Sequence, residues 1–208
     1  MTKRNVLIIN GHQQWTISRG DLNRALVKVA ADRLASGGWD VRITTVEEGY
    51  DVAAEIDKLE WANAIIFQFP AYWYSVPWGL KKYIDTVFTT GRGRIYLNDG
   101  RSRSDPSRKY GSGGRLQGRR YMISTTWNAP REAFGDPDQI FRGGRVDDVF
   151  LGLHVGLQFI GLTPFESFSC HDVVKNDDTH NDLYRFAEHI DSQFGALAAE
   201  MADGGRPS

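Results

Sequence analysis

The chain has 208 residues, of which 41% are apolar and 25% are charged, and its formal net charge is −1. These values are typical of a globular domain that builds its own core, and the near-zero charge argues against a nucleic-acid partner. The only cysteine, Cys170, excludes an internal disulfide and a multi-cysteine metal site, and a small buried side chain is expected there.

Apolar runs that indicate strands alternate along the chain with segments of helical periodicity. The first run, Val6 to Ile9, is too short for the core of a signal peptide, and no run is long enough to cross a bilayer. We therefore predict a cytoplasmic protein without stable membrane insertion. The predicted strands are residues 5–10, 40–46, 64–69, 121–126 and 165–170, and the predicted helices are residues 21–34, 52–61, 77–88, 146–160 and 178–201.

One long segment interrupts this alternation. Residues 91–118 are rich in glycine and arginine and show no clear period, which predicts an excursion or a long loop. We expect residues 1–201 to form a single domain that includes this excursion, and residues 202–208 to form a flexible tail.

The order of elements predicts an α/β fold with a parallel sheet covered by helices on both faces. Five strands in this order fit a flavodoxin-like doubly wound sheet with strand order 2-1-3-4-5. A Rossmann sheet is the competing interpretation. However, the loop after the first strand, residues 11–20, has neither the G-x-G-x-x-G of that fold nor the Gly-Lys-Ser/Thr of a P-loop.

The first candidate site is the polar loop that opens the helix at residue 21. Its members are Ser18, Arg19, Gly20, Asp21, Leu22 and Asn23. Free backbone N–H groups and the helix dipole make such a start an anion site, with a hydroxyl, a charge and an amide beside it. Simple capping of the helix by Ser18 is the alternative.

Two aromatic loops follow later strands. One contains Pro70, Ala71, Tyr72 and Trp73, and the other contains Thr126, Trp127, Asn128 and Ala129. Loops after strands one, three and four meet at one edge of a doubly wound sheet, where such folds bind ligands. A planar cofactor stacked on an aromatic face is therefore expected, and a hydrophobic plug beneath neighbouring loops is the alternative.

The excursion offers a third aromatic. Tyr110 lies in the glycine-rich turn over residues 109–114, which is either a lid over a ligand or a mobile surface loop. The surrounding arginines, Arg101, Arg103, Arg108 and Arg115, either meet a nucleotide phosphate or form a solvated face. No nucleophile–base pair and no metal-like histidine spacing are visible, so a cofactor is expected to carry the chemistry.

The chain resembles the modulator of drug activity B family, the flavodoxin-fold NAD(P)H:quinone oxidoreductases. The resemblance extends to about residue 172, and its most specific parts are Lys109-Tyr110-Gly111-Ser112-Gly113-Gly114 and Thr126-Trp127-Asn128-Ala129-Pro130. Residues 12–17 depart from the more basic loop of the family.

This resemblance implies a homodimer that holds FAD and reduces quinones with NAD(P)H in a two-electron, ping-pong hydride transfer. The FAD contacts that it implies are Ser18, Arg19, Gly20, Asp21, Leu22, Asn23, Arg24, Ala25, Pro70, Ala71, Tyr72, Trp73, Tyr110, Thr126, Trp127, Asn128 and Ala129. Trp73 and Trp127 are expected to form apolar walls, and Tyr110 is the candidate catalytic residue because it would hydrogen-bond the substrate or the flavin.

Two other functions remain open. One is an FMN-dependent azo- or nitroreductase on the same fold. The other is an electron carrier that binds FMN and a protein partner, which the extra length of this chain disfavours. Between the two hydride donors, the arginines of the excursion favour NADPH over NADH, because they could meet the 2′-phosphate.

Overall fold

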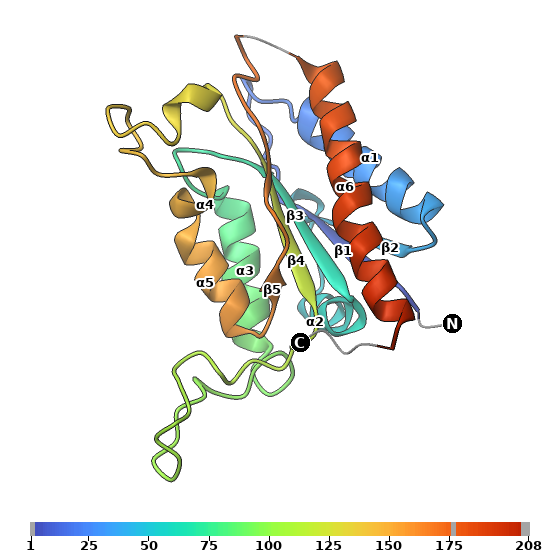
Figure 1. Ribbon diagram of the computed structural model, residues 1–208, viewed down its shortest axis with the longest axis vertical. Coiled ribbons are helices and arrows are strands. Elements are labelled where there is room, and N and C mark those ends of the chain that lie inside the picture. Colours follow the sequence, from blue (N-terminus) through green and yellow to red (C-terminus); the bar gives the residue numbers. More distant parts are fainter. Residues whose placement is uncertain (1–2, 176–177, 205–208) are drawn as a thin grey trace.

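In the computed structural model, a parallel sheet lies between two layers of helices (Figure 1). The structure describes residues 3–175 and 178–204. The strands are β1 (Asn5–Asn10), β2 (Asp40–Thr45), β3 (Ala64–Pro70), β4 (Arg120–Thr126), β5 (Thr163–Pro164) and β6 (Phe168–Cys170). The helices are α1 (Asp21–Ser36), α2 (Val52–Trp61), α3 (Trp78–Thr90), α4 (Val146–Val149), α5 (Leu151–Phe159) and α6 (Thr179–Ala202), with short 3-10 turns η1 (Val46–Glu48) and η2 (Arg131–Ala133).

The strand order confirms the predicted doubly wound sheet, because it runs β2-β1-β3-β4-β5 with every pairing parallel. Where one fifth strand was predicted over residues 165–170, the structure has two short strands that both pair with β4: β5 lies before that range, and β6 forms only its last three residues. Tyr121 lies opposite Pro164, and Ser124 lies opposite Phe168. The outer strand therefore advances by four residues, from 164 to 168, while β4 advances by three, from 121 to 124. This extra residue interrupts the pairing as a bulge does, and Pro164 has no N–H to donate.

Helices cover both faces of the sheet. α1 and α6 pack on one face, whereas α2, α3 and α5 pack on the other (Figure 1). Every residue of β1 and β3 is buried, as expected for central parallel strands. Val6 and Ile8 of β1 point toward the α1–α6 layer, and Leu7 and Ile9 join the opposite cluster. The loops that leave these strands therefore start from a core packed on both sides.

A buried carboxylate ties α3 to its neighbours. Glu55 of α2 is 1% exposed and accepts hydrogen bonds from the Thr44 hydroxyl at 2.9 Å, from Lys58 Nζ at 2.6 Å and from the Tyr83 hydroxyl at 2.8 Å. Burial and this carboxylate raise the pKa of Tyr83 well above its usual value. Burying polar groups is costly unless they are paired, and every member of this network has a charged or hydrogen-bonded partner. The network can therefore fix the position of α3 through Tyr83.

The helix predicted over residues 146–160 is two helices, α4 and α5, with Phe150 between them. Phe150 leaves helical geometry and is buried with its ring 5.2 Å from Phe69 and 5.5 Å from Trp127. Helix α6 extends to Ala202, which is the first residue of the predicted tail, and residues 205–208 of that tail lie outside the described residues. None of the described helices combines the length and apolarity needed to cross a bilayer.

The predicted excursion over residues 91–118 has no helix or strand and projects from the molecule (Figure 1). Its base is anchored, because Ile95 and Leu116 are buried and Leu116 N donates to Ile160 O at 3.0 Å. Its two arms also pair with each other, since Leu97 N donates to Gly113 O at 3.0 Å. The excursion is therefore tethered to the core at its base and reaches into solvent at its tip.

Candidate functional site

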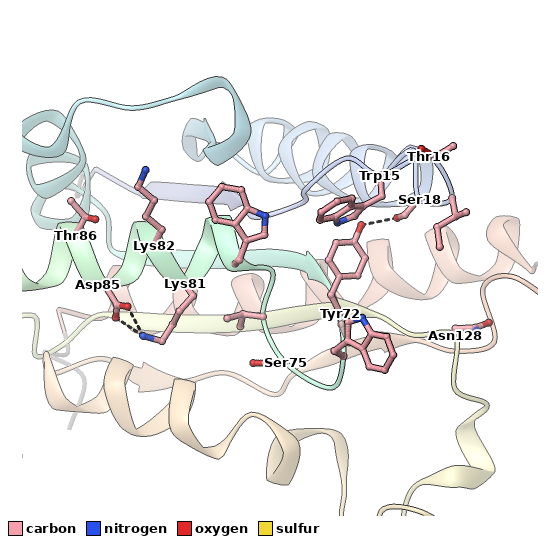
Figure 2. Close-up of a pocket in the computed structure, with 15 residues that line it drawn as sticks. Trp15, Thr16, Ser18, Tyr72, Ser75, Lys81, Lys82, Asp85, Thr86 and Asn128 are labelled. Carbon is pink, nitrogen blue, oxygen red and sulfur yellow. Dashed lines mark hydrogen bonds and ion pairs between the residues drawn. The ribbon is translucent and has the colours of Figure 1, made fainter.

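The loops that follow β1, β3 and β4 converge at the carboxyl edge of the sheet and share one cavity of about 1240 Å³. Figure 2 shows side chains from all three loops around it. The loop after β1 contributes Trp15 to Ser18, the loop after β3 contributes Ala71 to Trp73, and the loop after β4 contributes Asn128. The convergence predicted from the sequence is therefore present.

The start of α1 is not capped by a side chain. Gly20 is the N-cap residue, with φ at 76° in the left-handed region, and no side chain bonds the first N–H groups of the helix. The capping interpretation of Ser18 is wrong, because its hydroxyl lies 2.7 Å from the hydroxyl of Tyr72 instead. These free N–H groups and the positive end of the helix dipole can receive an anion.

Asn23 turns away from the cavity into a buried network. Its Nδ2 donates to Asn10 Oδ1 at 2.7 Å, and its Oδ1 accepts a hydrogen bond from Gln68 Nε2 at 3.1 Å. This network joins α1 to the ends of β1 and β3, so Asn23 positions the loop rather than facing the cavity. Of the other residues predicted at this helix start, Arg24 pairs with Asp21 on the surface and also donates to Arg19 O at 2.7 Å.

Two further residues predicted at this helix start, Leu22 and Ala25, are half-buried on α1. Leu22 packs on the edge of the core shared with α6. Neither residue lines the cavity described above, which Ser18 alone reaches from the predicted segment 18–25.

The loop after β3 presents Trp73 on a tight turn. Tyr72 and Ser75 exchange two backbone hydrogen bonds of 3.0 Å, and the residues between them, Trp73 and Tyr74, have φ values of 49° and 61°. Left-handed backbone is uncommon for bulky residues and persists where the surroundings impose it. Trp73 is 93% exposed at the tip of this turn, so the hydrophobic-plug interpretation does not describe it.

Trp127 occupies a different environment from Trp73. It is 3% exposed, donates from Nε1 to Thr125 Oγ1 at 2.8 Å, and its ring lies 5.1 Å from Phe134 and 6.0 Å from Phe141. It reaches only a smaller cavity of about 280 Å³, shared with Ala71, Tyr74, Ala129 and other residues of the two aromatic loops. The indole is thus part of the core under the loop, and the exposed Asn128 forms the rim.

The cavity continues along the exposed face of α3, which the sequence interpretation did not include in the site. The additional lining residues are Val76, Trp78, Lys81, Lys82, Asp85 and Thr86. Lys81 pairs with Asp85 at 2.5 Å (Figure 2). Trp78, in the first turn of α3, is 61% exposed. A tryptophan directly after Pro77 was the feature of the sequence that could have indicated this wall.

Tyr110 lies apart from these loops. Its ring is 67% exposed and lies 5.7 Å from Phe159, the last residue of α5, near the base of the excursion. The loops of the cavity lie at the opposite end of α3 (Figure 1). Arg101 is paired with Asp99 and lies over the Tyr110 ring. Within one chain, Tyr110 therefore does not join the site predicted for it.

No group of histidine, cysteine and carboxylate side chains within residues 3–175 and 178–204 could hold a metal ion. Cys170 is fully buried, as predicted, and burial raises the pKa of its thiol. What the edge of the sheet presents is an uncapped helix start, an exposed indole and an apolar wall. This combination suits a phosphorylated planar cofactor.

Comparison with known proteins identifies the family of this chain. Residues 4–194 match the model of a family described as having a flavodoxin-like fold. NADPH:quinone oxidoreductase MdaB of Haemophilus influenzae is 42% identical over 191 residues, which cover 92% of this chain and 100% of that protein. The chain belongs to the modulator of drug activity B family of NAD(P)H:quinone oxidoreductases. The prediction of an enzyme of this family, made from the sequence motifs, is confirmed.

Two further comparisons extend this result. An uncharacterized protein of Schizosaccharomyces pombe is 44% identical over 194 residues, covering 93% of this chain and 99% of that protein. The structure of general stress protein 14 from Treponema denticola, solved in complex with FMN, superimposes with a TM-score of 0.67 at 19% identity, covering 91% of this chain and 99% of that one. This structural likeness shows the shared fold.

Proposed function

We propose that this chain is an FAD-dependent NAD(P)H:quinone oxidoreductase that works as a homodimer. The observation that carries the proposal is the cavity of about 1240 Å³ that is lined by Ser18, two residues before an uncapped helix start, and by an exposed indole. A bound flavin supplies the hydride transfer that no side chain in the cavity can perform by itself.

The residues of the site have separable tasks. The N–H groups at the start of α1, with the Ser18 hydroxyl beside them, would hold the phosphates, and Trp73 would cover the ring system. The N–H of Trp127 already donates to Cys170 O. In the described part of the chain, this leaves the N–H groups of Asn128 and Ala129 as the predicted donors toward negative charge on the reduced ring.

The size of the cavity supports FAD over FMN. The cavity extends along α3 to Lys82 and Thr86, which leaves room for a ligand larger than a flavin ring with one phosphate. FMN remains the cofactor of the second candidate function, an azo- or nitroreductase, because flavodoxin-like sheets also hold FMN at this edge.

A second copy of the chain would complete the site. Tyr110 is one of the residues that the family resemblance assigns to FAD, yet it packs against Phe159 and does not line the cavity of its own chain. An isologous dimer brings such a residue to the partner's site, because each subunit contributes the same surface to the other. The exposed indole of Trp73 would be covered in the same way.

Quinone as the electron acceptor, NADPH as the preferred donor and a cytoplasmic location complete the proposal. Of the arginines expected to meet the 2′-phosphate, Arg101 is already paired with Asp99. Arg103, Arg108 and Arg115 remain as the candidates. A contact of this kind predicts a preference for NADPH, measured as kcat/KM for the two nucleotides, that shrinks as salt rises. Equal values for the two nucleotides would remove NADPH from the proposal.

Steady-state kinetics test the function. Initial rates with varied NADPH and varied quinone should give parallel double-reciprocal lines, because one cavity admits the two substrates in turn. Turnover of azo dyes under the same conditions separates the second candidate. A higher kcat/KM for an azo dye than for any quinone would favour the azoreductase.

A further inference from the structure

Glu47 lies in the turn η1 after β2 and is hydrogen-bonded to the loop that follows β1. Its Oε1 accepts one hydrogen bond from the backbone N of Gln14 at 3.0 Å and another from Nε2 of Gln13 at 3.1 Å. β2 is an edge strand of the sheet, and the loop after it is not one of the three that form the cavity. A carboxylate from a fourth loop therefore holds the loop after β1.

Contacts from two further elements meet at Gln13. Its backbone O accepts a hydrogen bond from the Tyr72 hydroxyl at 2.8 Å, which comes from the loop after β3. Its carboxamide lies against Gly79 in the first turn of α3, where a Cβ would be 2.7 Å from Oε1 of Gln13. The absence of a side chain at Gly79 leaves this space to the carboxamide. Gln13 thus has a defined position between η1, α3 and the loop after β3.

The residues that follow Gln13 and Gln14 line the cavity. Trp15 and Ser18 exchange two backbone hydrogen bonds of 3.0 Å, and the Ser18 hydroxyl contacts Tyr72 (Figure 2). Residues 14–17 are all exposed, so the loop buries little surface of its own. A segment with few buried contacts opens easily, and its conformation depends on hydrogen bonds such as those to Glu47.

The charge of Glu47 has the wrong sign for direct help in binding a phosphate. Burial lowers the pKa of His12, and the nearby carboxylate of Glu47 opposes this shift. The negative charge is therefore felt in the loop that leads to α1, where the phosphates of the cofactor are expected. By charge alone, Glu47 would weaken the binding of such an anion. A contribution through the position of the loop has the opposite sign, so the two effects can be separated.

We propose that Glu47 is a positioning residue, which acts through Gln13 and Gln14 to hold residues 15–18 in the conformation that receives the flavin. The inference rests on the function proposed above, and it requires no contact between Glu47 and the cofactor. Without these hydrogen bonds the loop samples other conformations. Only a fraction of the protein is then competent to bind, and the apparent affinity falls by that fraction.

Hydrogen exchange of the flavin-free protein tests the effect on the loop without any cofactor. Followed by mass spectrometry, exchange over residues 13–18 should be about threefold or more faster in Glu47→Ala than in wild type, because the N–H of Gln14 loses its acceptor. Glu48→Ala is the matched control, since Glu48 is an exposed carboxylate in the same turn, and it should exchange as wild type. Unchanged exchange in Glu47→Ala, or equal acceleration in Glu48→Ala, would overturn the proposal.

Fluorescence titration with FAD separates position from charge. Glu47→Ala should bind FAD about twofold to tenfold more weakly, although it removes a negative charge. Glu47→Gln removes the same charge but keeps an acceptor oxygen, so its affinity should lie within about twofold of wild type or be tighter. Tighter binding by Glu47→Ala would mean that Glu47 acts through its charge alone, and equal weakening in both variants would exclude the role of the acceptor.

A double-mutant cycle tests the route through Gln13. Gln13→Ala should also weaken FAD binding, and the double variant with Glu47→Ala should bind within about twofold of Glu47→Ala alone, because both changes remove the same hydrogen bond. Losses that simply add would refute this route. Failure of the wild-type protein to bind any flavin would refute the proposed function, whereas the exchange measurement would still decide whether Glu47 holds the loop.

Discussion

The hydroxyl of Tyr72 lies 2.7 Å from Oγ of Ser18 and donates to Gln13 O at 2.8 Å. A phenol has one proton, so Ser18 must donate to Tyr72 while Tyr72 donates to the carbonyl. This contact joins the loop that starts α1 to the loop that carries Trp73. The two ends of the proposed flavin site are therefore held in one hydrogen-bonded unit.

Tyr72→Phe should separate these two loops without disturbing the core. The lost hydrogen bonds predict FAD binding weaker by about threefold to tenfold, which corresponds to about 1 kcal/mol. Fluorescence titration of the flavin-free variant measures this change. An affinity equal to that of wild type would mean that the contact does not organise the site.

Trp73→Ala tests whether the indole covers one face of the flavin ring. Loss of the indole predicts flavin affinity reduced by about tenfold to a hundredfold, or about 1–3 kcal/mol, through lost stacking and buried area. Because the side chain is 93% exposed within one chain, its loss should leave the fold of each subunit intact, and the far-UV circular dichroism spectrum of the flavin-free variant should match wild type. Unchanged affinity and turnover would leave Trp73 without a role in cofactor binding.

Tyr110 allows a complementation test of the dimer. Tyr110→Ala removes the side chain that each chain would contribute to the site of its partner. Gly20→Val disrupts the helix start in the site of its own chain, because a Cβ there would overlap the His12 ring. After subunit exchange between these two inactive proteins, about a quarter of the wild-type activity should appear, since half the dimers are mixed and each has one intact site. Absence of recovery despite verified exchange would place Tyr110 outside the shared site.

His171 predicts a pH dependence of stability. Burial, aided by Arg131, lowers its pKa to about 4, against about 6.5 when unfolded. Between these values the unfolded chain binds more protons than the folded one, so stability falls as pH drops from about 6.5 to 4, by up to roughly 3 kcal/mol.

Urea unfolding at pH 7 and pH 4.5 measures this loss. His171→Gln should show a smaller decrease than wild type, and His180→Gln, with its exposed histidine, should show the wild-type decrease. The same decrease in all three proteins would mean that His171 is protonated in the folded state.

The central strands and the edge at which the site forms could be predicted from the sequence, because burial on both faces leaves unbroken apolar runs such as residues 64–69. The split of the last strand could not be predicted, since it depends on one extra residue between Pro164 and Phe168 opposite β4. Likewise, the break between α4 and α5 follows from where the Phe150 ring packs, which helical periodicity does not encode.

Within the site, the sequence did not show that the two tryptophans have different environments. Trp73 and Trp127 each follow a strand, yet one is exposed and the other is buried among phenylalanines that come from the distant residues 134, 141 and 150. Ser18 was a candidate helix cap because serine is a preferred residue at the N-cap position. In the structure, Gly20 occupies that position with left-handed backbone geometry. Tertiary contacts therefore decided which of the predicted residues face the cavity.

The cofactor released by the purified protein tests the central claim most directly. Heating should release a flavin that chromatographs as FAD, and the flavin in the intact protein should be reduced by NADPH and reoxidised by a quinone. FMN alone in the released material, or a protein that has no flavin and binds none on addition, would contradict the account.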